Sequence, residues 1–574
     1  MATQVQLEVA SANISNADTA GYTAKTAQQV SVVSAGAGAG TAISGIGSTI
    51  DKALLKSLID SVSALDASNT TNSYLNNLQA LYGATTGSNG TGTSIANTLA
   101  SLESALSSLS SNPSDATAKA SVVSALDSTL TQLRSISAGI QNQRSNADKD
   151  INADVDAVNK QLNLIGSLNI QIQQAKAAGQ PTGDLEDQRN TALQSVASQM
   201  NVQYFTTSSG SLQVYTPSGQ ALVDTTVHRL SYTPASTVTS ATTYIPGGSG
   251  GFSGITVNGI DVTSQIKSGN IGALVNLRDN TLPDAQAQLD QLATQLETAV
   301  NGVANQGTPS PAPATLTGTA TVTPSTSLSG IGTFRIALVD SSGKLSSYQD
   351  FNLSSYATVG DLVTAINGVS GLSASINGNG NLTITSSSAS YGVAINEMTS
   401  AVSPGGEGLS AWLGLNDIVT GSSAADIAVR SSLLNNASLL PASSLDSSST
   451  LTAGANVLPP GSSAVTNGLY NALTGSTSFS AVGGLAAVSA SFADYAANIV
   501  SDVASKASSA SSDYTNKQTT QSFYSSALSS ETGVNIDQET SRISTLQNQY
   551  EASAQVLATI KQMFSLLMTV MSTA

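Results

Sequence analysis

Cysteine is missing from this chain of 574 residues, and histidine occurs once, as His228. Without cysteine there is no disulfide, no thiolate nucleophile and no zinc–thiolate site. A Ser-His-Asp triad would have to use His228, which falls in a predicted β-strand and is interpreted as a surface residue. Trp412 is the lone tryptophan, so no aromatic-rich cleft singles out a carboxylate pair for glycoside hydrolysis. We therefore expect no enzymatic activity.

Charged residues are also few, at 10% of the chain against about a quarter in typical soluble domains. The net charge is −16, and the 20 lysines and arginines are spread along the chain. Nucleic acids and anionic membranes both attract grouped cations, so we expect neither as a partner. No apolar run approaches the roughly 20 residues that a membrane span needs. The first residues have no basic segment followed by an apolar core, so a cleaved signal peptide is not predicted.

Two short patterns resemble ligand-binding loops but lack essential residues. Acidic and amide side chains have the first spacing of a calcium loop at Asp148, Asp150, Asn152 and Asp154. Ala153 stands where that loop needs glycine, and Asn159 where it needs glutamate, so the pattern is interpreted as a solvated helix face. A second group belongs to no phosphate-binding motif and is interpreted as linker: Gly36, Gly38 and Gly40. We predict no metal and no cofactor.

The spacing of apolar residues predicts a chain of several domains. At about 150 residues per domain, the length allows three or four. Helical spacing dominates residues 49–200, and a single helix over 114–178 would be about 90 Å long. Near Asn201 the period changes to the alternation of β-strands, which continues to residue 274.

The second half of the chain repeats this change of pattern. Helical spacing returns over residues 275–307 and is followed by the proline-rich stretch 308–314. A second β-rich stretch, 315–427, contains a short predicted helix and a hairpin whose turn is Asn377–Gly380. Helical spacing resumes at Leu485 and continues in a last helix.

The predicted fold class is therefore multidomain α+β. The N- and C-terminal helices are expected to form coiled-coil or helical-bundle core domains, with β-rich domains inserted between them. We expect a terminal-helix inner core domain, a linker, a long-helix domain and two β-rich segments. Their expected boundaries are, in that order, 1–33 with 531–574; 34–48; 49–200 with 275–307 and 453–530; 201–274; and 308–452.

The last segment has the most regular apolar pattern in the chain. Apolar residues recur every seven positions and midway between them, with Glu539 and Ser553 as polar exceptions. This 3.5-residue period predicts a coiled coil. Past Val556 the helix is apolar on nearly all sides, which predicts burial by several neighbours. The seam expected to bind another helix consists of Ile536, Ile543, Leu546, Tyr550, Leu557, Ile560, Phe564, Leu567 and Met571.

The first segment is predicted to be a shorter amphipathic helix that ends near Asn16. Its apolar residues at helical spacing include Val5, Leu7, Val9 and Ile14. Neither terminal helix has enough surface to bury itself alone. Periodicity by itself fits a homo-oligomeric coiled coil as well as an intramolecular pair. We predict that the two chain ends pair as helices and become fully ordered when subunits stack.

Both ends of the sequence resemble proteins of the bacterial flagellar axis. An asparagine-rich motif of that superfamily is similar to the block ANISNADTAGYT, with Asn13, Asn16, Gly21 and Tyr22. Residues 531–564 are similar to the closing helix of rod, hook and junction proteins. Three more runs resemble the flagellar hook-associated protein 1 family in the same order, and they begin at Gly183, Gly269 and Gly414.

This resemblance implies a secreted structural subunit, exported unfolded by the flagellar type III apparatus, that forms a ring between hook and filament. The partners it implies are further copies of the chain, the hook protein, a second junction protein on the filament side, and an export chaperone at the C-terminal helix. Members of the family usually have further helical residues ahead of the matched N-terminal block.

Other functions remain open at this point. A hook or rod subunit of the flagellar axis would have the same terminal helices. A secreted oligomeric adhesin would use the β-rich domains to bind a surface ligand and the helices only to oligomerise. A hydrolase would need turnover that depends on His228 or a carboxylate.

Overall fold

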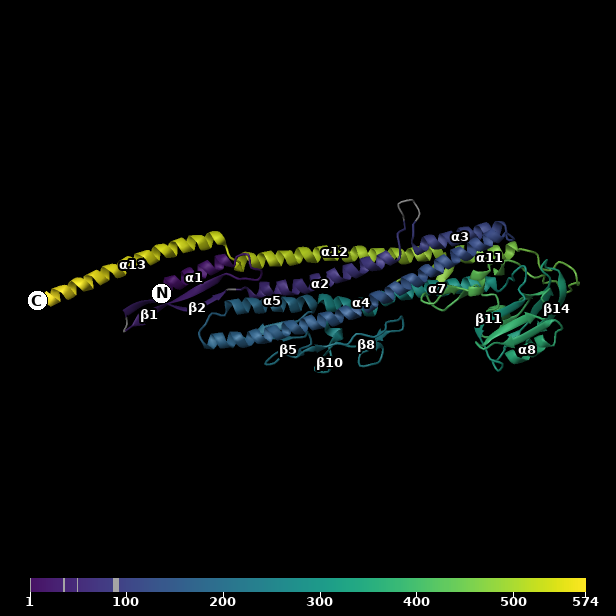
Figure 1. Ribbon diagram of the computed structural model, residues 1–574, viewed down its shortest axis with the longest axis horizontal. Coiled ribbons are helices and arrows are strands. Elements are labelled where there is room, and N and C mark those ends of the chain that lie inside the picture. The colour runs from purple at the N-terminus through teal and green to yellow at the C-terminus, as the bar shows by residue number, and fades with distance from the viewer. Residues whose placement is uncertain (1, 35–36, 49, 86–91, 574) are drawn as a thin grey trace. The chain divides into compact units, whose positions relative to one another are not determined.

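The computed structural model describes residues 2–34, 37–48, 50–85 and 92–573 (Figure 1). The chain divides into two compact units: unit 1 is Met1–Tyr74, Arg144–Asp279 and Ser508–Ala574, and unit 2 is Leu75–Gln143 and Asn280–Ala507. These units cut across the division expected from the sequence, because three of the long helices contribute to both. The finer division into core, helical and β-rich domains stays a prediction.

Unit 1 is built on long helices. Its helices, three of which continue into unit 2, are α1 (Ala2–Ser15), α2 (Lys52–Leu81), α4 (Ala116–Ala177), α5 (Gly183–Gln199), α6 (Gly269–Asn276), α12 (Phe492–Thr532) and α13 (Ile536–Thr573). The 62 residues of α4 form one helix, as the apolar spacing over 114–178 predicts. Gly166 does not break it; a Cβ there would lie 2.7 Å from Val227 Cγ2, so glycine permits close packing.

A β hairpin follows α1, formed by β1 (Lys25–Ser34) and β2 (Ala37–Ser48). The pairing is antiparallel and runs from Lys25 opposite Ser48 to Ser34 opposite Ala37. The prediction of a linker over 34–48 is therefore wrong, although Gly36 lies outside the described residues. The second strand consists mostly of small residues, which suggested a linker, but the main chain supplies the hydrogen bonds of a ladder whatever the side chains are.

The β-rich segment of unit 1 covers the middle of α4. Its short strands are β3 (Gln203–Thr206), β4 (Leu212–Tyr215), β5 (Ala221–Val223), β6 (Leu230–Ser231), β7 (Thr243–Tyr244), β8 (Gly251–Phe252), β9 (Thr256–Val257) and β10 (Ile260–Asp261). Apolar residues of α4 with spacings of three and four, from Ile151 to Ile165, pack against α5 and these strands. The predicted change of period near Asn201 is confirmed.

Two buried arginines fix this β-rich segment to the helices. Arg278 donates to Asp148 on α4 (Nη1 to Oδ1, 3.0 Å) and to its neighbour Asp279 (Nε to Oδ1, 2.8 Å). Arg144 donates to the carbonyls of Arg278 at 3.1 Å and Thr239 at 2.9 Å. Both guanidinium groups stack over the ring of Phe252, 5.3 Å (Arg144) and 4.4 Å (Arg278) from its centre.

Unit 2 combines helices with two three-stranded sheets. Its further helices are α3 (Ile95–Ser111), α7 (Leu282–Ala304), α8 (Val359–Asn367), α9 (Leu409–Leu413), α10 (Ser431–Asn435) and α11 (Ser463–Thr474), and a π-helical turn, Leu277–Thr281, precedes α7. The sheets have the strand orders β11-β16-β15 and β14-β13-β17. The described strands of the unit are β11 (Thr315–Thr321), β12 (Gly330–Ile331), β13 (Thr333–Val339), β14 (Leu345–Asn352), β15 (Leu372–Ile376), β16 (Asn381–Ser386), β17 (Gly392–Asn396), β18 (Ala401–Val402), β19 (Val419–Thr420), β20 (Ala428–Val429), β21 (Thr477–Phe479) and β22 (Val488–Ala490).

The second β-rich stretch contains the elements that its sequence predicts. Strands β15 and β16 pair as a hairpin, and the side chain of Asn377 accepts hydrogen bonds from the N–H groups of Asn379 and Asn381 in the turn. The helix α8 has a capping box between Thr358 and Asp361.

The helical pattern that was expected from Leu485 onward begins later. Val488 lies in β22, and α12 starts at Phe492. Gly483 and Gly484 both have a positive φ just before this point, which favours a turn over a helix. The ring of Phe479, in β21, stacks on Tyr495 at 3.8 Å and holds the β hairpin to the start of α12.

The buried arginine cluster gives a test of how unit 1 is held together. Replacing Arg278 with Met should lower the free energy of opening of residues 203–261 by about 3–5 kcal/mol, because Asp148 is left as a buried unpaired carboxylate. Native-state hydrogen exchange of that segment measures the change. The exposed pair Lys56–Asp60 supplies the control, since Lys56→Met should change the same quantity by about 0.5 kcal/mol or less. Equal effects of the two variants would contradict this role.

Candidate functional site

The two ends of the chain meet in unit 1, where α1 packs against the first part of α13. The end of α1 lies beside Glu539, and its start shares a groove with Tyr550, so the two helices run antiparallel (Figure 1). Val9, Ala10 and Asn13 are the buried residues of α1. The sequence predicts Val9 for this face, but it gives no sign that an asparagine would be buried beside it.

Asn13 is completely buried, and its amide forms four hydrogen bonds. The Nδ2 atom donates to the Lys25 carbonyl at 3.0 Å and to Glu539 Oε1 at 3.1 Å. The Oδ1 atom accepts from the Lys25 N–H at 2.9 Å and from the Tyr22 hydroxyl at 3.0 Å. One side chain thus joins α1 to β1 and to α13, and all of its hydrogen-bonding capacity is used.

A buried ion pair extends this junction to α5. The Lys25 ammonium contacts the carboxylate of Asp187, and both side chains are less than a tenth exposed. Asp187 also accepts from the Thr23 hydroxyl at 2.8 Å and from the Thr23 N–H at 3.0 Å. A buried carboxylate with these partners is satisfied, whereas removal of one partner leaves a charge that water cannot reach.

The predicted motif residues Gly21 and Tyr22 lie at the edge of the same junction. Gly21 has a φ of +79°, and a Cβ there would lie 2.7 Å from the Thr191 hydroxyl, so the turn requires glycine. The Lys25 ammonium lies 4.6 Å from the centre of the Tyr22 ring. Burial, with the nearby charges of Asp184, Asp187 and Glu539, raises the pKa of Tyr22 to about 12, so its hydroxyl remains a donor to Asn13 at neutral pH.

The other N-terminal residues named from the sequence contribute less to this junction. Val5, Leu7 and Ile14 are half-buried. The side chain of Asn16 donates to the carbonyl of Ala12 at 2.9 Å, which also accepts the Asn16 N–H at 3.1 Å, at the end of α1.

Only the first part of the predicted C-terminal seam is covered. Leu546 is 5% exposed and Ile543 is half-buried, but Ile536 is about half exposed. From residue 547 to residue 572 every residue of α13 is exposed. Large apolar side chains in that part are about half to two-thirds exposed or more, up to 71% at Met571, and include Tyr550, Leu557, Ile560, Phe564 and Leu567. The predicted pairing of the chain ends is present over the first part of α13, and the assembly role of the exposed seam residues stays a prediction.

The exposed helix also meets a simple criterion for a membrane span. By length and composition, one window within Phe492–Ser572 is apolar enough to cross a bilayer, and none of it is buried. The expectation that no stretch is apolar enough to span a membrane is wrong by this criterion. It considered unbroken runs of apolar residues, whereas the criterion uses the mean hydropathy of a helical window. A helix buried between protein subunits passes the same test, so composition alone identifies no membrane span.

The calcium-loop pattern lies inside α4 and forms no loop. Asp148 is buried and bound to Arg278, and Asp150 accepts from the Tyr74 hydroxyl at 2.8 Å. Within the described ranges, no group of three or more acidic, His or Cys side chains is placed to hold a metal ion.

His228 lies before β6 and not within a strand. Its Nε2 faces both Asp224 Oδ1 at 3.2 Å and the Thr226 hydroxyl at 3.3 Å, while Nδ1 faces Asn258 at 3.1 Å. A catalytic triad needs the nucleophile and the carboxylate on opposite ring nitrogens. This arrangement therefore does not form a relay.

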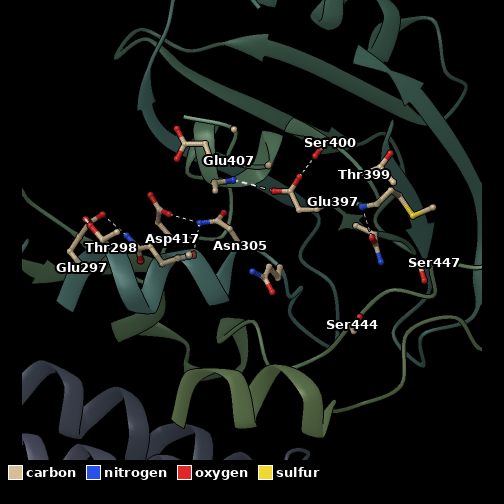
Figure 2. Close-up of a pocket in the computed structure, with 18 residues that line it drawn as sticks. Glu297, Thr298, Asn305, Glu397, Thr399, Ser400, Glu407, Asp417, Ser444 and Ser447 are labelled. Atoms are coloured by element: carbon tan, nitrogen blue, oxygen red, sulfur yellow. Dashed lines mark hydrogen bonds between the residues drawn. The ribbon is translucent and has the colours of Figure 1, made fainter. Parts of the chain in front are cut away.

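Unit 2 contains a polar cleft of about 1010 Å³, shown in Figure 2. Two of its buried carboxylates have partners within the fold. Glu397 accepts from the N–H groups of Ser410 at 2.7 Å and Ala411 at 3.3 Å, at the start of α9. Asp417 accepts from the Asn305 amide at 2.6 Å. Burial raises the pKa of both carboxyl groups, and these hydrogen bonds oppose the shift. Both carboxylates therefore have structural partners.

Family comparisons match four parts of the chain, all to flagellar proteins. Residues 85–318 match the helical domain of flagellar hook-associated protein FlgK, and residues 333–388 match the flagellin hook IN motif. Residues 1–23 match the flagella basal body rod protein, and residues 526–570 match the C-terminal domain of the flagellar basal body rod FlgEFG proteins. No curated protein sequence matches the chain.

A solved structure, the flagellar hook junction protein FlgK from Burkholderia pseudomallei, has a similar fold. The TM-score is 0.50 at 14% sequence identity, over 82% of this chain and 98% of that chain. The match to the FlgK helical domain lies between two terminal matches, which is the order expected from the sequence.

These matches, together with the similar fold, support the flagellar hook-associated protein 1 family for this chain. It is a structural subunit of the flagellar hook–filament junction type, with the multidomain α+β fold that the sequence predicts. The flagellar matches imply an exported, extracellular component of the flagellum that assembles with other axial proteins.

The Asn13 junction can be tested by replacing the hydrogen-bond donor of its side chain with an acceptor. Asn13→Asp should expose α1 to faster hydrogen exchange, because a carboxylate then faces both Glu539 and the Lys25 carbonyl. Adding Glu539→Gln to the same chain restores a donor between the two helices and should recover part of the protection. If Asn13→Asp left exchange in α1 unchanged, the amide would not hold the chain ends together.

Proposed function

We propose that the chain joins hook to filament by assembling into a ring, and that the subunits bind one another through α1 and α13. The observation that carries this proposal is the exposed second half of α13. Its first heptads pack on α1, yet the seven-residue apolar repeat continues over residues 547–572, where every residue is exposed. At about 25 cal/mol per Å² of apolar surface, leaving this half in water is costly, and neighbouring subunits would cover it.

The threonine hydroxyls of α13 are also suited to burial by a neighbour. The hydroxyls of Thr540, Thr545, Thr559 and Thr569 each donate to a carbonyl four residues earlier, at 2.7–3.0 Å. Burial of a hydroxyl is expensive only when its hydrogen bond is lost. These hydroxyls keep their bonds when water is removed, so covering them costs little.

We infer the partners of this assembly from the family resemblance, and the same surface is where they would bind. Further copies of the chain would meet side by side, with the hook protein on one side of the ring and a second junction protein on the other. Before assembly, an export chaperone would cover the exposed part of α13. The similarity to this family supports these partners. The length of exposed α13 indicates that another protein covers it both before and after assembly.

A hook or rod subunit is the second candidate, favoured by the matches of both chain ends to rod proteins. The two differ in what purified protein does: a hook or rod subunit would form long tubes alone, whereas a junction subunit would not. A secreted adhesin would differ from both, because its deletion would leave motility intact and remove binding to a surface. Loss of a junction subunit would release filament subunits into the medium.

Leu557→Asp is the sharpest test of the assembly surface. It puts a charge at the centre of the exposed seam, where burial against a neighbour would leave the carboxylate unpaired. Cells with this variant as their sole copy should lose swimming motility and shed filament subunits, measured on soft agar and by analysis of the medium.

The matched control is Gln562→Asp, which adds the same charge to the same exposed helix at a position outside the predicted seam. This variant should retain motility. The amount of each variant in the medium shows whether export still works. If cells with Leu557→Asp formed normal filaments, the assembly proposal would be wrong.

A further inference from the structure

The groove between α1 and α13 has an open side. It has a volume of about 600 Å³ and lies between residues 4–15 of α1 and Tyr550 of α13. Leu7 and Tyr550 supply apolar surface, while Ser11, Ala12 and Ser15 are small. Small side chains in such a row let a helix backbone approach closely.

The groove also has negatively charged side chains, which favour a partner with a positive charge. Glu8 is the single charged residue of α1; it is exposed and lines the groove. Glu551, next to Tyr550, is exposed and acidic as well. Within the described part of the chain, Glu8 forms no ion pair. The groove therefore offers apolar contact and unpaired negative charge together.

The end of α13 has the complementary surface. Between residues 552 and 573 the single charged residue is Lys561, which is exposed. It lies four residues after Leu557 and three before Phe564, so the cation and these two apolar side chains share one face of the helix. In heptad terms Lys561 flanks the seam, the position at which ion pairs set partner choice in coiled coils.

The two surfaces of one chain do not reach each other. Lys561 is eleven residues beyond Tyr550 in an unbroken helix, which places it about 16 Å further along the axis. Figure 1 shows α13 continuing past the start of α1 with no element beside its end. A second copy can supply what the first lacks.

We propose that the end of α13, residues 556–571, binds the α1–α13 groove of a second copy, with Lys561 paired to Glu8. This inference rests on the proposed assembly through the terminal helices and names the contact within it. The groove and the segment that fills it belong to different surfaces of the same chain, so the contact is heterologous. Repetition of a heterologous contact gives a closed ring or an open helical array.

The absence of cysteine allows a direct test of this contact. Two tagged versions of the full chain, Glu8→Cys and Lys561→Cys, are produced in the same cells, and isolated flagella are oxidised with copper phenanthroline. A disulfide between the two tagged chains is expected. The control pair is Glu8→Cys with Gln562→Cys, since residue 562 is turned about 100° around the helix and should cross-link several-fold more slowly.

Charge reversal in otherwise unmodified chains gives the second arm. Glu8→Lys or Lys561→Glu alone should weaken association of purified chains about two- to fivefold, and the two together in one chain should restore it. Additive losses in the double variant would overturn the pairing. Both changes are at exposed positions, so circular dichroism should remain that of the parent chain.

The outcomes separate this inference from the proposed function. Motile cells whose flagella show no cross-link between residues 8 and 561 would overturn the contact and leave the assembly proposal standing. Motility that survives Leu557→Asp would overturn the assembly proposal itself. Binding of the purified chain to phosphatidylcholine vesicles, in place of cross-linking, would instead identify a lipid surface as the partner of the helix end.

Discussion

The amide of Asn13 links α1 to the nearby start of β1 and to α13, at the other end of the chain. A buried amide must find partners for two donors and one acceptor oxygen, and here these partners come from β1, Tyr22 and α13. This requirement fixes how far α1 can slide along α13, because a shift of one turn would leave the amide and Glu539 without each other. The position of α1 in turn determines which part of α13 it packs against, and therefore which part of α13 is exposed.

Several parts of the fold could be predicted because their signals are local. The run of apolar residues from Ile151 to Ile165 has the period of a helix face, and that face is buried in α4. The turn Asn377–Gly380 and the strands beside it have a standard hairpin sequence, and they form one. In the same way, the heptads of the last segment predicted a helix that needs a partner, and α13 has a partner over only part of its length.

The contacts that hold the terminal junction could not be predicted, because their partners are distant in sequence. Asn13 and Glu539 are 526 positions apart, and Lys25 and Asp187 are 162 apart. Glu539 looked like an exception to an apolar seam, whereas its buried Oε1 accepts from Asn13. The strand β2 escaped prediction for another reason: its glycines and alanines have little β preference, and the ladder with β1 depends on main-chain bonds that no side-chain pattern records.

The paired arginines Arg144 and Arg278 have a mechanical consequence for unit 1. Their bonds reach α4, the start of the π-helical turn and the loop at Thr239, and the ring of Phe252 is clamped under both cations. Residues 203–261 therefore cannot rotate on α4 without breaking several short, directional bonds at once. A drag force on this segment would be passed to α4 as a torque instead of being lost in a loose hinge.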